Sequence, residues 1–296
     1  MTEGEFIAAL RTLPLHPGAR GLTDDGAVVD AGALFVTTDS LVEGVHYLAS
    51  DPPGDVAWKL VATNLSDLAA KGAGVEGVLL NYPIGDDAWD RAFLAGFGDA
   101  MRAMGARLIG GDTVSLRGAR TLTLTALGSD AAAPVRSGAR AGDALWVTGT
   151  IGDAGAGLTI AQGSDGPAEL LDAYRRPVPR LAEGRALAPV ARAMMDVSDG
   201  LLIDAGRMAA ASGVAVTVDL DAVPLSDAYR AWGGDARAAA TAGDDYELLF
   251  ALAGGAVPPV AATRVGWFAV GEGLSLIEHG RAVALPSSLG FEHRGS

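Results

Sequence analysis

Carboxylates gather in six short motifs that are flanked by glycine, serine or threonine. Their nine aspartates are Asp24, Asp25, Asp39, Asp67, Asp112, Asp196, Asp199, Asp244 and Asp245. Most of these motifs stand at the edge of an apolar run, where we expect a strand or helix to end and a carboxylate to point into a shared cleft. Carboxylate oxygens are preferred ligands of Mg²⁺. The pattern therefore predicts a site for divalent cations.

The overall charge indicates what those cations would do. The formal net charge is -14, so an anionic substrate such as a nucleotide would be repelled unless divalent cations bridged it to the carboxylates. The same charge argues against nucleic acid as a partner, because the chain has no basic stripe to release phosphate counterions. Lys59 and Lys71 are the only lysines, and no GxxxxGK[ST] motif is present, which excludes a P-loop. We expect a magnesium-dependent enzyme that handles phosphates.

The composition narrows the class of protein further. With 296 residues, of which 49% are hydrophobic, the chain is long enough for two domains. No apolar run approaches the length of a membrane span, and the first residues lack the basic start of a signal peptide, so we expect a cytoplasmic protein with no membrane partner. The absence of cysteine excludes disulfides, thiolate metal sites and a cysteine nucleophile.

Strand and helix patterns alternate along the chain, which predicts an α/β protein of the α+β type. In the first half we expect strands over 33–38, 75–81, 106–110 and 121–127, with helices over 55–71 and 87–104. The first and third of these strands should end at Asp39 and Asp112. On the helix over 55–71, an apolar stripe ends in Asn64 and Asp67, whose polar groups need partners.

The turn-rich segment 129–143 predicts a domain boundary, which we set between residues 1–135 and 136–296. Beyond it we expect a strand over 144–149, a glycine-rich turn and helix over 151–163, helices over 180–193 and 200–211, a strand over 214–220 and an interior strand over 246–252. Ser198 would cap the helix over 200–211, and Gly213 would end it.

Each motif of the first half has a functional and a structural interpretation. Asp24 and Asp25 would repel each other unless a cation or water separates them, yet such a loop is also a common solvated turn. Thr37, Thr38 and Asp39 form a hard-oxygen cluster suited to Mg²⁺, or a capping cluster. Two glycines before Asp112 suit a metal or nucleotide site and also a plain turn. His46 is a candidate ligand-binding residue or an ordinary surface or core histidine.

The motifs of the second half are open to the same two interpretations. Asp196 and Asp199 could bind one ion between a strand and a helix, although a capping role for Ser198 explains part of the pattern. Asp244 could contact a ligand while Asp245 makes a supporting hydrogen bond, and an acidic turn is the structural alternative. The run Arg175, Arg176, Pro177, Pro179, Arg180 could clamp phosphates or start a helix.

Taken in order, these motifs resemble a known family over nearly the whole chain. TDDGAV, TTDSLVEGVHY, NLSDLAAKGA, LIGGDT, VRSGARAGD, VTGTIGDAGAGL, RRPVPR, MMDVSDGLLIDAG and AGDDYELLF are similar to the motif series of the thiamine-monophosphate kinases. These enzymes share a superfamily with aminoimidazole ribonucleotide synthetase and selenophosphate synthetase. The resemblance implies ATP-dependent phosphorylation of thiamine monophosphate with several Mg²⁺ ions. It also implies a two-domain protomer whose N-terminal mixed-sheet domain pairs in a homodimer, followed by a C-terminal α/β domain.

The resemblance also implies roles for individual residues. The metal ligands would be Asp25, Thr38, Asp39, Asp67, Asp112, Asp196 and Asp199, with Asp24 and Thr37 beside them; ATP would contact Gly111, Arg136 and Ser198; and thiamine monophosphate would contact His46, Asp244 and Phe291. This chain has Asp244 where the family usually has glutamate, which leaves the carboxylate one methylene shorter. Another synthetase or phosphotransferase of the superfamily, or a non-catalytic metal- or nucleotide-binding module, are the alternatives.

Overall fold

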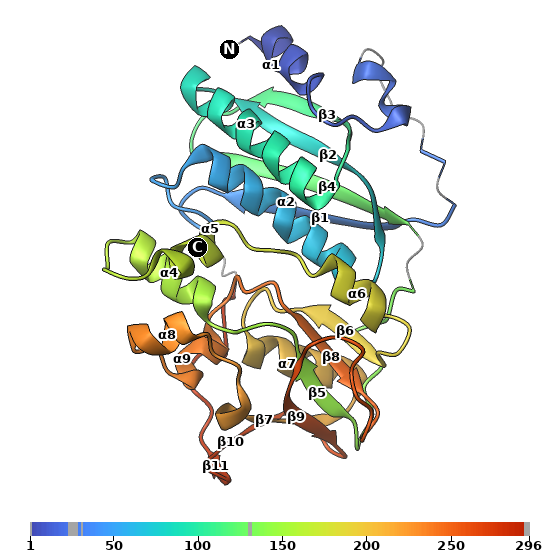
Figure 1. Ribbon diagram of the computed structural model, residues 1–296, viewed down its shortest axis with the longest axis vertical. Helices are drawn as coiled ribbons and strands as arrows, with labels where there is room; N and C mark the ends of the chain where they lie inside the picture. The colour runs from blue at the N-terminus through green and yellow to red at the C-terminus, as the bar shows by residue number, and fades with distance from the viewer. Residues whose placement is uncertain (1, 23–28, 31, 130–131, 293–296) are drawn as a thin grey trace. The chain divides into compact units, whose positions relative to one another are not determined.

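The computed structural model describes residues 2–22, 29–30, 32–129 and 132–292. The chain forms two compact units (Figure 1). The first contains Met1–Leu68 and Ala73–Ala131, and the second contains Ala69–Gly72 and Ala132–Ser296. Mixed helices and sheets in both units confirm the predicted α/β class. No helix in the described part of the chain is long and apolar enough to cross a membrane.

The first unit is built on a four-stranded sheet with the order β1-β4-β2-β3. Its strands are β1 (Phe35–Val42), β2 (Gly74–Ile84), β3 (Leu108–Ser115) and β4 (Thr121–Ser129). Strands β2 and β3 are parallel and the other pairs are antiparallel, so the sheet is mixed. Helices α2 (Pro53–Ala69) and α3 (Asp87–Met104) cover one face (Figure 1), and the chain begins with α1 (Glu3–Leu10) and the 3-10 helix η1 (Pro17–Leu22).

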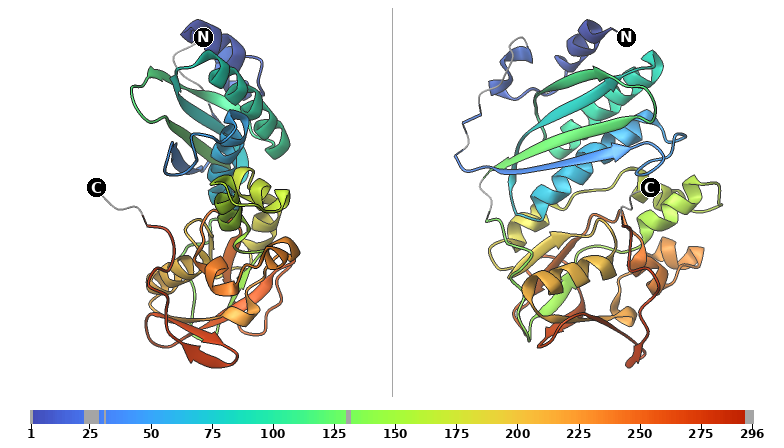
Figure 2. Two further views of the ribbon diagram at one scale, coloured as in Figure 1. Left: turned by 90° about the vertical axis from the view of Figure 1, so that its left-hand side faces the viewer. Right: turned by 180° about the vertical axis from the view of Figure 1, so that it is seen from behind.

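The two faces of this sheet differ in burial because side chains alternate along a strand. Leu41, Leu80 and Leu124 are buried on the face that the helices cover. Val36 and Thr38 alternate with them on β1 and are exposed. Figure 2 shows this second face from behind, with no described helix of the unit lying over it. We call it the open face of the first unit.

Two strands run past the residues at which we expected them to end. Pairing of β1 with β4 continues to Val42, and pairing of β3 with β2 continues to Ser115. Asp39 and Asp112 therefore lie inside strands, and the expectation that they follow strand ends is wrong. The strands continue because backbone pairing depends on the neighbouring strand, which an apolar run along the sequence does not report.

The second unit contains a seven-stranded sheet with the order β11-β10-β7-β9-β5-β8-β6. Its strands are β5 (Ala144–Val147), β6 (Ala193–Asp196), β7 (Ala215–Asp219), β8 (Leu248–Leu252), β9 (Thr263–Ala269), β10 (Leu274–Glu278) and β11 (Arg281–Val283). Its helices are α4 (Asp153–Ala161), α5 (Ala168–Arg175), α6 (Leu181–Leu187), α7 (Leu201–Ser212), α8 (Asp227–Trp232) and α9 (Ala236–Thr241), with the 3-10 helix η2 (Leu220–Ala222).

Strand β8 is buried on both faces, which confirms the prediction of an interior strand. Leu249 and Ala251 belong to a core that includes residues of α7, whereas Leu248 and Phe250 pack into a second cluster with Leu187 of α6. Gly213 ends α7 in a left-handed conformation, as expected. The helix expected over 180–193 is wrong beyond Leu187, because the chain must turn there before it enters β6.

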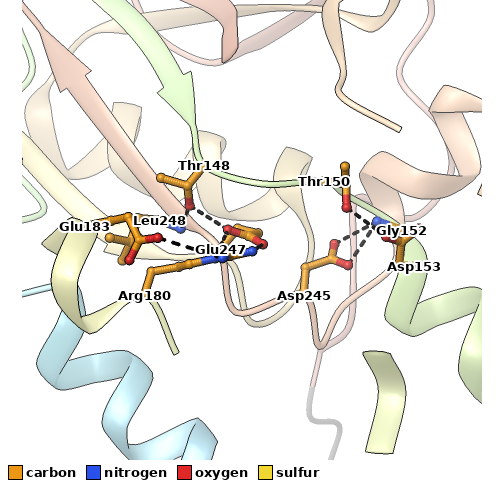
Figure 3. Close-up of polar contacts among 9 residues, drawn as sticks. All are labelled: Thr148, Thr150, Gly152, Asp153, Arg180, Glu183, Asp245, Glu247 and Leu248. Carbon is orange, nitrogen blue, oxygen red and sulfur yellow. Dashed lines mark hydrogen bonds and ion pairs between the residues drawn. The ribbon is translucent and has the colours of Figure 1, made fainter. Parts of the chain in front are cut away.

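The amino end of α4 is capped from outside the helix. Gly152 precedes the helix and has no side chain that could cap it. The carboxylate of Asp245 instead accepts the Gly152 N–H at 2.9 and 3.0 Å (Figure 3). A second backbone hydrogen bond comes from Ala154. Unpaired N–H groups of a helix start require such an acceptor, so Asp245 makes the predicted supporting hydrogen bonds.

The cap makes the stability of the protein depend on pH. Burial of the carboxyl raises the pKa of Asp245 well above its ordinary value, and the Gly152 N–H only partly opposes this. Above the ordinary pKa, about 3.9, the folded state keeps a proton that the unfolded state has lost, so stability falls as pH rises towards the raised value. We expect the free energy of unfolding of the wild type, measured relative to Asp245→Asn, to fall as the pH rises above about 4.5, just over the ordinary pKa of an aspartate.

The free energy of unfolding is measured by urea denaturation at each pH, and Asp87→Asn is the matched control. The hydrogen bond from Arg91 lowers the pKa of the exposed Asp87 to about 2, so both states are ionised across the whole range. The stability difference between the wild type and this variant should stay constant with pH. An equally constant difference for Asp245→Asn would contradict the expected shift.

Candidate functional site

A strand and a helix of the first unit bring three candidate residues together. Thr37 and Asp39 alternate along β1 on the same face as the buried Leu41, which is the face that the helices cover. The hydroxyl of Thr37 donates to the carboxylate of Asp67 near the end of α2. Thr37, Asp39 and Asp67 thus form one group of hard-oxygen side chains at the junction of β1 and α2.

Asn64 fixes the backbone of this group. Its side chain is completely buried, and its Oδ1 accepts the Asp39 N–H at 3.0 Å. Its Nδ2 donates to the Leu60 carbonyl one helical turn earlier at 2.9 Å. A buried amide with both ends bonded holds β1 against α2, because breaking either bond would leave a buried polar group unpaired. The predicted polar end of the α2 stripe is therefore present and has partners.

Thr38 and Asp112 lie away from that group. Thr38 is exposed on the open face, where its hydroxyl donates to the Leu124 carbonyl at 3.0 Å. Asp112 is opposite Asn81, which is also exposed, so it projects from the open face as well. Strands β1 and β3 are the two edges of the sheet, and Asp112 lies two residues further along it than Thr38, which places their backbones about 16 Å apart at ordinary strand spacing and rise.

The remaining candidates of the first unit have more local surroundings. Gly111 has a φ of 158°, and a Cβ there would lie 1.9 Å from the Leu80 carbonyl oxygen, so the close approach of β2 requires glycine. His46 lies in the turn after β1, and its Nδ1 accepts the Val42 N–H at 3.0 Å. That bond places the proton of the neutral imidazole on Nε2. Asp24 and Asp25 lie outside the described residues.

In the second unit a buried carboxylate shapes the loop between β6 and α7. Asp204 is completely buried, and its Oδ2 accepts the N–H groups of Ser198 at 3.2 Å and Asp199 at 3.1 Å. Burial raises the pKa of Asp204, while the hydrogen bond from the Asp199 N–H opposes the rise. Ser198 does not cap α7: Gly200 precedes the helix and makes no side-chain cap, so the capping prediction is wrong. The sequence could have indicated that Asp204 is buried, because it lies between Leu201 and Met208 on the apolar stripe of α7.

The carboxylate of Asp199 is paired with a guanidinium that the sequence analysis did not single out. Arg207 Nη1 donates to Asp199 and also, at 2.9 Å, to Asp204. The spacing from Asp204 to Arg207 is one helical turn, so both side chains reach the loop from the same side of α7. Asp196 is the last residue of β6 and precedes Asp199 by three residues. It is buried, with 7% of its surface exposed.

The segment Asp244–Glu247 runs beside this loop. The Asp244 N–H donates to the Ser198 carbonyl, and the Tyr246 N–H donates to the Val197 carbonyl, both at 2.8 Å. The Phe291 N–H donates to the Asp199 carbonyl at 2.9 Å. Ser198, Asp199, Asp244 and Phe291 therefore meet around one stretch of backbone, although the sequence separates them widely.

Asp244 and Tyr246 have strained backbones. Their φ angles are 70° and 51°, in the left-handed region that residues with side chains rarely adopt. Such conformations cost on the order of 1–3 kcal/mol each and tend to persist at functional sites, where surrounding contacts enforce them. Here the enforcing contacts are the backbone hydrogen bonds to Val197 and Ser198.

A second buried carboxylate anchors the far end of this segment. Glu247 is 5% exposed, and Arg180 donates to it through Nε at 2.7 Å and Nη2 at 2.5 Å (Figure 3). The hydroxyl of Thr148 donates to the same carboxylate at 2.6 Å. Gly149 must lack a side chain, because a Cβ there would lie 2.0 Å from Glu247 Oε1.

These contacts support the helix-start interpretation for one residue of the arginine and proline run, Arg180. Arg180 is the residue that precedes α6, as the helix-start alternative predicts, and its guanidinium is bound to Glu247. Arg175 ends α5, and Arg176 follows it as the C-cap. Arg136, a predicted ATP contact, is exposed, and its carbonyl accepts the Ser212 hydroxyl at 3.4 Å. Ser212 ends α7, about 18 Å along the helix from the loop that carries Ser198.

The oxygen-bearing side chains of the candidate site in each unit are suitable ligands for Mg²⁺. Among the described residues, no three His, Asp or Glu side chains come close enough together to hold a metal ion by themselves. Mg²⁺ does not require such a cage, since it is usually bound by one or two carboxylates together with substrate phosphates and water. Thr37, Asp39 and Asp67 in one unit, and Asp196 and Asp199 in the other, supply oxygen ligands of that kind.

Comparisons with known proteins identify the same family over most of the chain. Residues 23–129 match the N-terminal domain of the AIR synthase related proteins, and residues 140–266 match their C-terminal domain. The thiamine-monophosphate kinase of Caulobacter vibrioides is 38% identical in an alignment that covers 99% of this chain and 91% of the relative.

Solved structures give the same result. The thiamine-monophosphate kinase from Stenotrophomonas maltophilia K279a has a TM-score of 0.79 and 36% identity, covering 88% of this chain and 91% of that chain. AaThiL complexed with AMPPCP and TMP has a TM-score of 0.77 and 30% identity, covering 90% of each chain. With such identity over nearly its whole length, the chain belongs to the thiamine-monophosphate kinase family of AIR synthase related proteins.

Proposed function

We propose that this chain transfers the γ-phosphoryl group of ATP to thiamine monophosphate, giving thiamine diphosphate and ADP. The observation that carries the proposal is the similarity, over nearly the whole chain, to relatives named thiamine-monophosphate kinase. The relative AaThiL was solved with AMPPCP and TMP, an ATP analogue and the acceptor of this reaction. ATP is thus the co-substrate and thiamine monophosphate the acceptor.

The proposed reaction needs no covalent enzyme intermediate. A phosphate oxygen of thiamine monophosphate forms a bond to the γ-phosphorus while the bond from that phosphorus to the bridging oxygen of ADP breaks. The attacking oxygen is largely ionised near neutral pH, so no general base is required. The protein's task is to align the two substrates and to exclude other acceptors.

Residues of both units would share this task. In our proposal Gly111, Arg136 and Ser198 contact ATP, while His46, Asp244 and Phe291 contact thiamine monophosphate. The imidazole of His46, with its proton on Nε2, would act there as a hydrogen-bond donor. The carboxylate of Asp244 would attract the positively charged heterocycle.

Several Mg²⁺ ions would screen the carboxylates from the phosphates. The residues that would hold them are Thr37, Thr38, Asp39, Asp67, Asp112, Asp196 and Asp199, with Asp24 and Asp25, which lie outside the described residues. When bound, Mg²⁺ neutralises charge that develops on the transferring phosphoryl group. The chain's net charge of -14 makes such screening necessary. Because ATP is the co-substrate, we place the reaction in the cytoplasm.

The domain roles follow from the same assignment. In our proposal, residues 1–135 form the ATP- and Mg²⁺-binding domain and also pair two copies, while residues 136–296 form the C-terminal domain. The open face of the first unit supports pairing, because Val36 and Val114 are 56% and 50% exposed there. A second copy laid on this face would bury them and would also come close to Thr38 and Asp112.

A substrate screen by ADP release tests the proposed reaction. ATP consumption should depend on added thiamine monophosphate and should not occur with a purine ribotide. Turnover with a purine ribotide alone would favour another member of the superfamily. Nucleotide binding with no turnover on any acceptor would favour a non-catalytic module.

The cation site can be tested by substitution. Asp39→Asn and Asp199→Asn should each lower kcat on the order of 100-fold, because a charged Mg²⁺ ligand is lost while the apolar core stays intact. Asp99→Asn is the control, since Asp99 is exposed on α3, where it accepts a hydrogen bond from Arg102 one helical turn away. Its turnover should equal that of the wild type. Undiminished activity of both site variants, or of the wild type in excess EDTA, would refute the cation site.

The homodimer can be tested through its proposed surface. Light scattering of the wild type at micromolar concentration should give twice the mass of one chain. Val36→Glu places a charge on the open face and should shift the mass towards that of a monomer. Val270→Glu is the control, because Val270 is 90% exposed on the second unit and should leave the dimer intact. A monomeric wild type would overturn this part of the proposal.

A further inference from the structure

The four residues Asp244–Glu247 divide into two pairs with different partners. Asp245 and Glu247 are bound by the glycine-rich loop between β5 and α4, through Gly152 and Thr148 respectively (Figure 3). Asp244 and Tyr246 instead bind each other: the Tyr246 hydroxyl donates to Asp244 Oδ1 at 3.0 Å. The anchored pair therefore fixes the segment that carries Asp244 and Tyr246.

Tyr246 is held more firmly than its neighbour. Only 8% of its surface is exposed, and its N–H donates to the Val197 carbonyl at 2.8 Å. Its φ of 51° is rare for a residue with an aromatic side chain. Burial, backbone bonding and an enforced conformation together place the phenol hydroxyl at a defined position.

Asp244 is the more accessible partner and lies beside Ser198, whose carbonyl accepts its N–H. A hydroxyl bonded to one carboxylate oxygen restricts rotation of the carboxylate and directs its second oxygen. Such restriction lowers the entropy lost when a ligand binds. A fixed donor is especially effective for an aspartate, which has only two side-chain torsions.

We propose that Tyr246 is a positioning residue for substrate binding. Its hydroxyl holds the Asp244 carboxylate in the orientation that meets the cationic heterocycle of thiamine monophosphate. The inference rests on the proposed function and adds to it a residue that does not itself contact the reacting phosphates. The effect is specific to the acceptor, because ATP carries no comparable cation.

Tyr246→Phe tests this role, since it removes only the hydroxyl. Binding of thiamine monophosphate alone is measured by calorimetry, and steady-state kinetics are measured for both substrates. We expect Kd and KM for thiamine monophosphate to rise roughly fivefold or more, as for a lost hydrogen bond to a charged group. KM for ATP and kcat should change less than about twofold. An unchanged Kd for thiamine monophosphate would overturn the proposal.

Two further variants separate positioning from folding. Tyr82→Phe is the matched control, because the Tyr82 hydroxyl also donates to a carboxylate, that of Asp90 at 2.7 Å, within the core of the first unit. It should leave both KM values unchanged. Asp244→Gly removes the carboxylate and suits the φ of 70° at that position. In that background Tyr246→Phe should have no further effect on Kd.

The remaining outcomes are also decisive. An equal rise in KM for both substrates, with a larger fall in Tm than Tyr82→Phe causes, would mean a structural role and would overturn the inference. Additive effects of Tyr246→Phe and Asp244→Gly would overturn it as well. A wild type that binds thiamine monophosphate but consumes no ATP with it would sink the proposed function, while the binding comparison for Tyr246 would still stand.

Discussion

A buried carboxylate must be given hydrogen-bond donors, and in the second unit this requirement organises the loops. Asp204 takes the N–H groups of Ser198 and Asp199, Asp245 takes that of Gly152, and Glu247 takes the Arg180 guanidinium and the Thr148 hydroxyl. A buried polar group without its hydrogen-bond partner costs on the order of 1–3 kcal/mol, and more where it is ionised. The loops therefore have little freedom to move away from the carboxylates that hold them.

The acidic residues therefore form two groups, one that holds the backbone of the loops and one that is available to bind cations or substrate. The anchoring group shapes the backbone from within. The other group consists of carboxylates that lie on backbone held in place by hydrogen bonds. It includes Asp39, Asp67, Asp199 and Asp244. In the first unit the buried Asn64 side chain accepts the Asp39 N–H, just as Asp204 accepts backbone N–H groups in the second unit. An acidic chain can thus carry many carboxylates without unfolding, and it can use some of them for cations that an anionic substrate requires.

The sequence predicted some of the helices and strands, but α5, α8, α9 and the strands β9 to β11 were not predicted, and neither was the pairing of the strands. Periodicity predicted α3 to the residue, the interior strand β8 and the end of α7 at Gly213, because these depend on local apolar patterns. It could not reveal that β1 and β3 continue through Asp39 and Asp112, since strand pairing is set by residues far along the chain. The alternation that sends Asp39 and Asp112 to opposite faces of one sheet also depends on that register. Likewise, the arginine that might have clamped phosphate is bound to Glu247, 67 residues away.

The most direct measurement follows the labelled γ-phosphoryl group of ATP in the presence of thiamine monophosphate. Transfer without a protein nucleophile places the label at the terminal phosphate of thiamine diphosphate, and the protein remains unlabelled throughout turnover. Two results would contradict the account: stable labelling of the protein by a species that then passes the label to the product, or release of the label as inorganic phosphate with no thiamine diphosphate formed.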